Sequence, residues 1–137
     1  MDWDDIPVRD VMSEPVREAS GDMAVTQVAR ILCDEQIGSV LVRGNPDGIL
    51  TDTDIVRAVG DGCNPERTVI AEVRTSPVIT VSPDATVRDA AELMADHEIK
   101  KLPVLDRESY LGIVTTTDMI DQVSPELDDI IGAFTDD

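Results

Sequence analysis

Apolar residues recur at helical spacing in two stretches of the chain, with polar residues filling most positions between them. Both sets fall at positions i, i+3, i+4 and i+7, which share one face of a helix. They are Val25, Val28, Ala29 and Leu32 in the first stretch, and Val87, Ala90, Ala91 and Met94 in the second. The pattern predicts two amphipathic helices, each buried along one side.

Short apolar runs bounded by turn-forming residues follow each predicted helix. Such runs are typical of strands, and the Gly-, Asn- and Pro-containing segment 44–48 joins the first two as a hairpin. The predicted strands are residues 39–42 and 49–51 in the first half, then 77–81, 102–105 and 111–114 in the second.

Capping residues and prolines predict further helices. Asp5 or Thr68 caps a short first helix in each half, with Pro7 in its first turn, and Asp84 caps the second amphipathic helix. The other helices are predicted at residues 54–59, 118–123 and 126–131.

The chain repeats itself. Residues 48–56 match residues 112–120 at five of nine positions, and residues 10–16 match residues 72–78. A copy of about 60 residues is marginal alone, because a small domain buries too little of its surface. The repeats therefore predict one pseudo-symmetric α+β unit, in which the two copies pack through their sheets.

The repeat pattern also sets the predicted domain boundaries. The link from Gly60 to Glu66 separates the copies, since it contains glycine, asparagine and proline. We assign residues 1–62 to the first repeat with its N-terminal helix, residues 63–123 to the second repeat, and residues 124–137 to an acidic tail.

The formal charge of -18 excludes several classes of function. Nucleic acids and anionic membranes attract clustered Lys and Arg, so neither is an expected partner. No apolar run approaches the ~20 residues that a membrane span needs. The acidic N-terminus lacks the apolar stretch of a secretory signal, and a cytoplasmic location is expected. The 20 Asp against 9 Glu, spread along the chain, resemble the surfaces of proteins from halophilic organisms, with an ordinary acidic protein as the alternative.

Two Thr-rich corners carry the candidate chemistry. The pattern Thr-x-Thr-Asp occurs where a strand is expected to become a helix, and helix N-termini favour anions. Threonine hydroxyls can donate to a phosphate, and the Asp carboxylate can accept from both hydroxyls of a ribose. The same residues are also preferred helix caps, so capping alone remains an alternative. They are Thr51, Thr53 and Asp54 in one copy, and Thr115, Thr117 and Asp118 in the other.

The only two lysines of the chain, Lys100 and Lys101, are adjacent. In an acidic chain such a pair can receive a phosphate, although an exposed pair of charges often has no role. The first copy has Gly38 and Ser39 at the aligned positions, so the two copies are expected to differ in their affinity for anions.

The repeated pattern resembles a tandem pair of cystathionine-β-synthase (CBS) domains. The stretches that carry the resemblance are residues 10–13, 37–42, 48–54, 99–104 and 112–118, in the same order in both copies. The resemblance implies a β-α-β-β-α unit in each copy, sheet-to-sheet packing with two clefts, and association into disc-like homodimers. It also implies an adenosine ligand such as AMP, ADP, ATP or S-adenosylmethionine.

The resemblance further implies roles for individual residues. Asp54 and Asp118 would hold ribose hydroxyls. The four threonines would contact phosphate or ribose, and both lysines would contact phosphate. Contacts to an adenine would come from Val78, Ile79, Ile99 and Pro103 in the second copy, and from Val16, Ile37 and Gly38 in the first.

These observations predict a regulatory module that senses an adenine nucleotide and signals to a separate effector chain. The sequence contains no Ser-His-Asp set, no metal-ligand cluster and no Gly-rich phosphate loop, so no catalysis, metal or catalytic cofactor is expected. One alternative is a scaffold dimer with non-functional pockets. Another is a hydrolase using Asp52 and Asp54, which is disfavoured because Thr116 replaces the first carboxylate in the second copy.

Overall fold

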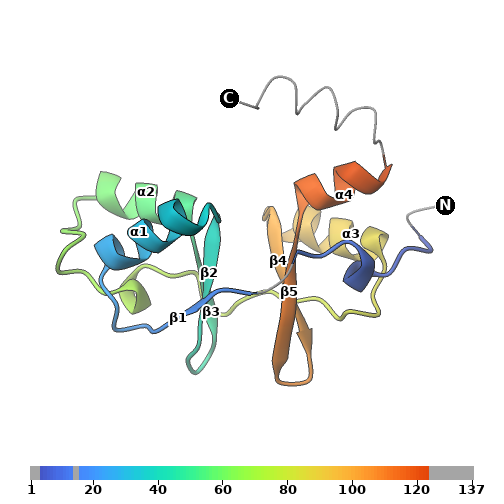
Figure 1. Ribbon diagram of the computed structural model, residues 1–137, viewed down its shortest axis with the longest axis horizontal. Helices are drawn as coiled ribbons and strands as arrows, with labels where there is room; N and C mark the ends of the chain where they lie inside the picture. Colours follow the sequence, from blue (N-terminus) through green and yellow to red (C-terminus); the bar gives the residue numbers. More distant parts are fainter. Residues whose placement is uncertain (1–3, 14–15, 124–137) are drawn as a thin grey trace. The chain divides into compact units, whose positions relative to one another are not determined.

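The computed structural model describes residues 4–13 and 16–123, and its elements follow the repeat (Figure 1). The first half contains the 3-10 turn η1 (Val8–Asp10), strand β1 (Glu18–Ala19), helix α1 (Val25–Glu35), strands β2 (Ser39–Val42) and β3 (Gly48–Thr51), and helix α2 (Asp52–Gly60). The second half contains η2 (Ile70–Glu72), α3 (Val87–His97), β4 (Lys101–Asp106), β5 (Ser109–Thr115) and α4 (Thr116–Val123). The mixed α+β class predicted from the sequence is confirmed.

One compact unit comprises residues 17–78. Its sheet has the order β1-β2-β3, with β1 parallel and β3 antiparallel to β2. Helices α1 and α2 cover this sheet (Figure 1). The core contains the apolar face of α1, as its periodicity predicts, together with Val40, Leu50 and Ile70.

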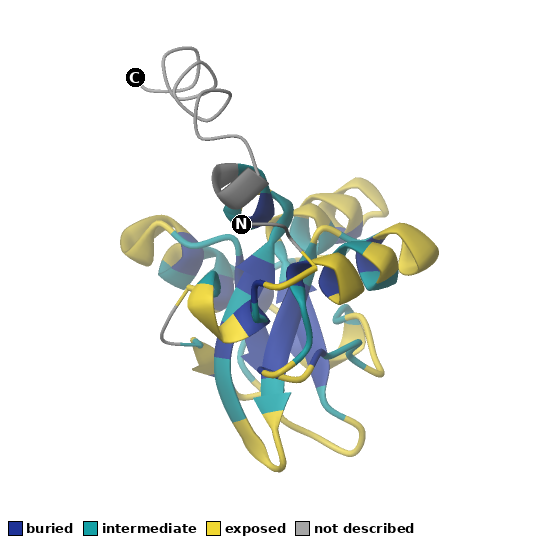
Figure 2. Cartoon of the chain, turned by 90° about the vertical axis from the view of Figure 1, so that its right-hand side faces the viewer, coloured by how far each residue is buried: buried dark blue, intermediate teal, exposed yellow. Residues whose placement is uncertain are grey.

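Among the described residues, the other compact unit combines the N-terminal segment with residues 79–123. Strands β4 and β5 form an antiparallel pair, and an isolated parallel bridge joins Val81 to Val104. Val87, Ala90 and Met94 of α3 face a core that also includes Ile6 and Val8 from the N-terminal segment. Figure 2 shows the pattern common to the helices, whose outer faces are exposed while the strands are largely buried.

The packing units differ from the sequence repeats, because the leading segment of each repeat packs with the other repeat. These exchanged segments are residues 4–13 and 16 of the first repeat and residues 63–78 of the second. The N-H of Val8 donates to Ala85 O at 2.8 Å, and the N-H of Val87 donates to Ile6 O at 2.9 Å. The same pair of bonds recurs 62 residues later for the segment between the repeats. There Ile70 N donates to Met23 O, and Val25 N donates to Thr68 O, both at 2.9 Å. The predicted boundaries therefore divide the sequence, whereas the folded units cross them; how the repeats pack on each other stays a prediction.

The predicted strand at residues 77–81 is wrong, and a proline explains why. In the first repeat the N-H of Leu41 donates to Arg17 O at 2.8 Å, which ties β1 to β2. The aligned residue in the second repeat is Pro103, which has no N-H to donate. Only the next pairing survives, with Val81 N donating to Pro103 O at 3.1 Å. The strand therefore shrinks to a single bridge.

Several predicted helix starts also need correction. Thr86, not Asp84, caps α3, since its hydroxyl accepts from Asp89 N. The two short first helices are 3-10 turns capped by Pro7 and Val69 without a side-chain bond, so neither Asp5 nor Thr68 caps them. Helices α2 and α4 begin two residues earlier than predicted, directly after β3 and β5. The helix predicted at 126–131 lies outside the described residues.

Candidate functional site

The corner between β3 and α2 is built around Asp54. Its Oδ2 accepts from the N-H of Thr51 at 2.9 Å, and the Thr51 hydroxyl accepts from Asp54 N at 3.2 Å. This reciprocal pair is a capping box, which satisfies two N-H groups at the start of the helix. The Asp54 side chain is only 10% exposed. Its second oxygen, Oδ1, accepts from the hydroxyl of Thr75 at 3.4 Å.

The corner between β5 and α4 has the same geometry around Asp118. Its Oδ2 accepts from Thr115 N at 2.9 Å, and Asp118 N donates to the Thr115 hydroxyl at 3.1 Å. Its Oδ1 lies 3.5 Å from the donating hydroxyl of Ser13. Each Asp thus uses one oxygen to cap its helix and turns the other toward a hydroxyl from the exchanged segment.

The backbone before the hairpin is fixed against each corner. Asp52 N donates to Gly38 O at 3.0 Å, and Thr116 N donates to Lys100 O at 3.1 Å. These bonds bring the segments at Gly38 and at Lys100 beside the helix starts. The carboxylate of Asp52 accepts from Thr53 N at 2.8 Å, which gives it a local role at the helix start rather than a pairing with Asp54.

Glycine at the start of the motif allows the exchanged segment to cross the strand. A Cβ on Gly112 would lie 2.6 Å from the main-chain oxygen of Ser13, and one on Gly48 would lie 2.8 Å from that of Thr75. Neither distance admits a carbon atom. The crossing is held by paired main-chain bonds, since Ser13 bridges to Ile113 and Thr75 bridges to Ile49. The Gly of the motif and the hydroxyl residue therefore act together in placing each corner.

The charges around the two corners differ. Arg57 Nη1 lies 3.8 Å from Asp54 Oδ1 in the first corner. At the second corner Lys100 is exposed and Lys101 is half-buried at the start of β4. Within the described part of the chain neither lysine forms an ion pair with a carboxylate. Among the described residues, the lysine pair therefore keeps its positive charge on the Asp118 side without a carboxylate partner.

The structure places all the predicted site residues in two groups. The unit of Asp54 also holds Ile37, Gly38, Thr51, Thr53 and Val78. The unit of Asp118 also holds Val16, Ile79, Ile99, Lys100, Lys101, Pro103, Thr115 and Thr117. Most of them are half-buried; Thr53, Lys100 and Thr117 are exposed, and Pro103 is buried. Val16 and Val78 thus fall with the corner of the other repeat.

Ser13 and Thr75, whose hydroxyls reach the Asp carboxylates, are not among the site residues predicted from the sequence. The signal was present, because the two residues occupy aligned positions in the leading segments of the two repeats. The aligned positions indicate a shared role only once it is known that each leading segment packs with the other repeat.

The groups gathered at each corner are suited to binding a ligand. Each corner offers a half-buried carboxylate, hydroxyl groups and a helix N-terminus, which together match a polyhydroxylated, anionic ligand. No group of three or more His, Cys, Asp or Glu residues in the described chain could hold a metal ion. Among the described helices, none is long and apolar enough to cross a membrane.

Comparison with known proteins identifies the repeat. A model of the CBS domain matches residues 8–61 and 70–125. An uncharacterized protein of Methanopyrus kandleri is 35% identical over 127 residues, covering 89% of this chain and 64% of its own length. The CBS domain-containing protein YhcV of Bacillus subtilis is 31% identical over 123 residues, covering 87% of each chain. The chain thus spans nearly the whole of one relative and under two thirds of the other.

Two solved structures share the architecture. The CBS domain pair of protein MJ0100, in complex with 5'-methylthioadenosine and S-adenosyl-L-methionine, has a TM-score of 0.78 and 27% identity, over 88% of this chain and 97% of that one. A hexameric CBS-CP12 protein from bloom-forming cyanobacteria has a TM-score of 0.80 and 26% identity, over 93% of this chain and 77% of that one.

Proposed function

Because the chain belongs to the CBS domain family, we propose that it is a regulatory module that binds an adenosine-containing ligand at the Asp54 and Asp118 corners. Candidate ligands are AMP, ADP, ATP and S-adenosylmethionine. The proposal assigns the chain no catalytic step, and it places the effector on a separate chain. A cytoplasmic, halophilic setting stays a prediction from the sequence.

The observation that carries the proposal is the second carboxylate oxygen in each corner. Capping alone needs only Oδ2, yet in both corners Oδ1 also faces a hydroxyl from the exchanged segment. A vicinal diol can replace or share that contact, with the carboxylate accepting from the ligand and the Ser or Thr hydroxyl acting as donor or acceptor. The ribose of an adenosine ligand supplies such a diol. The solved complex of protein MJ0100 supports a ligand of this class.

The charge difference between the corners predicts different ligands. Lys100 and Lys101 make the Asp118 corner the better site for a phosphate, since charge-assisted hydrogen bonds to phosphate are strong. The first corner has Gly38 and Ser39 instead, and its Arg57 lies beside Asp54. We therefore assign nucleotides to the Asp118 corner, and ligands with little or no phosphate to the Asp54 corner.

Binding would act through the exchanged segments. Ser13 belongs to the first repeat by sequence but is fixed to β5 through its bonds with Ile113. A ligand that contacts both Asp118 and Ser13 favours the closed state, in which the segment that contains Ser13 stays paired with β5. It shifts that equilibrium only by the difference between its affinities for the closed and open states. An effector protein that recognises the paired arrangement of this segment and β5 would then respond to the ligand.

Thermal unfolding with a panel of ligands tests the proposal. The chain is heated in concentrated salt with AMP, ADP, ATP, S-adenosylmethionine or no ligand, with GMP as the control for the base. A ligand at 100 times its dissociation constant adds ~2.7 kcal/mol to the free energy of unfolding. The expected result is an increase of several degrees in Tm with at least one adenosine compound. An unchanged Tm with every adenosine compound would overturn the proposal.

Self-association is a second candidate function, favoured by an apolar surface on α2. Among the described residues, Val56 is 70% exposed and Val59 is 49% exposed, and no other large apolar residue is as open. The hexameric relative supports assembly of such pairs, and a homodimer remains the predicted state. Sedimentation of the Val56→Glu variant tests this reading: a dimer that persists unchanged would exclude this face as the interface.

A further inference from the structure

A groove unrelated to either corner lies along α3. It is a hollow of about 400 Å³ between the helix and residues 80–85, which falls within the size range of known binding pockets. Val81, Ala85 and Leu93 line it with apolar atoms, while Asp89, Glu92 and Asp96 line it from the helix. The three carboxylates follow one another at helical spacing, so they share the face of α3 that borders the hollow.

The aligned positions of the first repeat carry different residues. On α1 the positions aligned with the three carboxylates hold Gln27, Arg30 and Asp34, with a sum of charges near zero. Met23 stands where the second repeat has Ala85. Methionine carries three more heavy atoms than alanine, so the aligned space in the first repeat receives a longer side chain. The row of three carboxylates and the short Ala85 side chain are thus specific to the second repeat.

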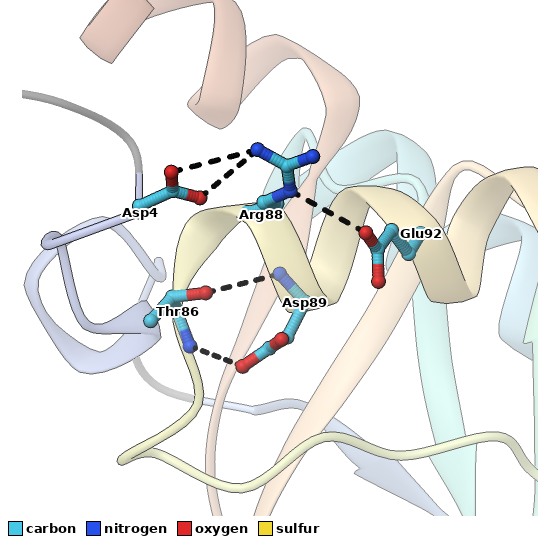
Figure 3. Close-up of polar contacts among 5 residues, drawn as sticks. All are labelled: Asp4, Thr86, Arg88, Asp89 and Glu92. Atoms are coloured by element: carbon cyan, nitrogen blue, oxygen red, sulfur yellow. Dashed lines mark hydrogen bonds and ion pairs between the residues drawn. The ribbon is translucent and has the colours of Figure 1, made fainter.

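The negative charge at the groove is only partly neutralised. Arg88 Nη1 lies 3.3 Å from Asp4, and Arg88 Nε lies 3.4 Å from Glu92 (Figure 3). Asp4 first, and then Glu92, raise the pKa of Arg88 above its ordinary value, so one guanidinium is shared by two carboxylates. Asp89 uses one oxygen to accept from Thr86 N at 3.0 Å in the capping box of α3. Its charge and that of Asp96 are not offset by an ion pair within the described residues.

We propose that this groove docks a basic segment of a partner protein, with the aliphatic stem of an Arg or Lys on Leu93 and Ala85 and its cationic end at the carboxylates. Long basic side chains combine an apolar stem with a charged end, which matches an apolar floor beside a row of carboxylates. Charge complementarity favours this occupant over an acidic copy of the same chain. The proposal is independent of the ligand corners, because none of their residues line the groove.

Transplanting residues from the first repeat tests the proposal without damaging the helix. The Asp89→Gln and Glu92→Arg double variant copies the face of α1. It keeps a capping bond, because Gln27 Oε1 accepts from Ala24 N at 2.8 Å in α1. The Ala85→Met variant copies Met23 and fills the floor without changing any charge. The control is the Asp61→Gln and Glu66→Arg double variant, which changes the charge equally at two exposed positions of the other unit.

The probe is a fluorescein-labelled 12-residue peptide of Arg and Leu, with a Gln and Leu peptide as its uncharged counterpart. Binding is measured by fluorescence anisotropy at about 0.15 M ionic strength, where charges more than ~8 Å apart are largely screened. We expect the Arg peptide to bind. We expect the groove double variant and Ala85→Met each to weaken it about tenfold or more, and the control to change it less than about twofold.

Each other outcome overturns the proposal. Equal weakening by the control shows general attraction to an acidic surface. Unchanged binding of the Arg peptide to the Ala85→Met variant shows that the peptide does not occupy the hollow. Equal binding of the uncharged peptide shows that the carboxylates do not contribute to binding. Absence of binding to the unmodified chain refutes it directly. If Ala85→Met fails to unfold cooperatively, the groove double variant decides alone.

Discussion

The two capping boxes on α3 and α4 allow ligand binding to be separated from helix stabilisation. In α4 the Asp118 carboxylate accepts from Thr115 N at 2.9 Å, and in α3 the Asp89 carboxylate accepts from Thr86 N at 3.0 Å. The return bonds from the helix to the threonine hydroxyls are both 3.1 Å. Replacing either Asp by Ala should therefore remove about 1 kcal/mol of capping stability, which lowers Tm by roughly 3–5 °C for a domain of this size.

The two variants should respond differently to a nucleotide. Of Asp118 and Asp89, it is Asp118 that turns its second oxygen toward a hydroxyl of the exchanged segment, 3.5 Å away at Ser13. A nucleotide at 100 times its dissociation constant adds ~2.7 kcal/mol to the unmodified chain. We expect Asp89→Ala to keep this gain in full. We expect Asp118→Ala to lose most of it, and Asp54→Ala to lose less, because the lysines lie on the Asp118 side.

Calorimetry of the three variants in concentrated salt, with and without nucleotide, measures both quantities. The matched loss of stability in Asp118→Ala and Asp89→Ala checks that the capping contributions are equal. The reasoning fails if Asp89→Ala also loses the nucleotide-dependent gain, since the effect would then follow from helix destabilisation. It fails equally if Asp118→Ala keeps the gain.

Further predictions concern the exchanged segments and the charge. Gly112→Ala places a carbon 2.6 Å from a main-chain oxygen, so chemical denaturation should show a loss of about 1–3 kcal/mol, whereas Gly60→Ala, with nothing within 4 Å, should show none. Because the guanidinium partner of Asp4 has a raised pKa, it stays charged well above neutrality. Asp4→Asn should therefore change stability equally at pH 6 and pH 9, and less as salt is added. Circular dichroism should show cooperative unfolding for fragment 17–78 and not for the equally long fragment 1–62, which lacks its covering segment. The chain as a whole should gain stability as salt rises from low to molar concentration, because its charge of -18 repels itself; equal stability at both would contradict a halophilic adaptation.

Local patterns predicted the parts of the fold that depend on local physics. The apolar spacing of α1 and α3 identified residues that are buried in the structure, with Val25, Val28 and Val87 fully enclosed. The Thr-x-Thr-Asp pattern predicted both a helix start and a polar corner, and Asp54 and Asp118 lie there. In each of these cases the residues that form the pattern lie within a few positions of the element that they predict.

The errors in the prediction arose from long-range contacts. The strand at 77–81 has suitable residues, but its formation depends on a donor that Pro103, more than 20 residues away, does not have. Ser13 meets Asp118 across 105 positions of the chain, and no local pattern reports such a contact. The predicted N-cap at Asp84 was wrong for a local reason. Two residues further on, the hydroxyl of Thr86 accepts from Asp89 N at 3.1 Å and so caps the helix.

The exchange of leading segments makes each corner depend on residues from both repeats. If each repeat kept its own first segment, a ligand at Asp118 would contact residues of one repeat only, and nothing in that contact would report on the other. Here the hydroxyl facing Asp118 comes from Ser13 in the leading segment of the first repeat, and the one facing Asp54 comes from Thr75 in the leading segment of the second. Each corner is therefore closed by chain from the repeat that does not supply its aspartate. A ligand bridging carboxylate and hydroxyl would hold that crossing in place, so its binding free energy is coupled to the connection between the repeats.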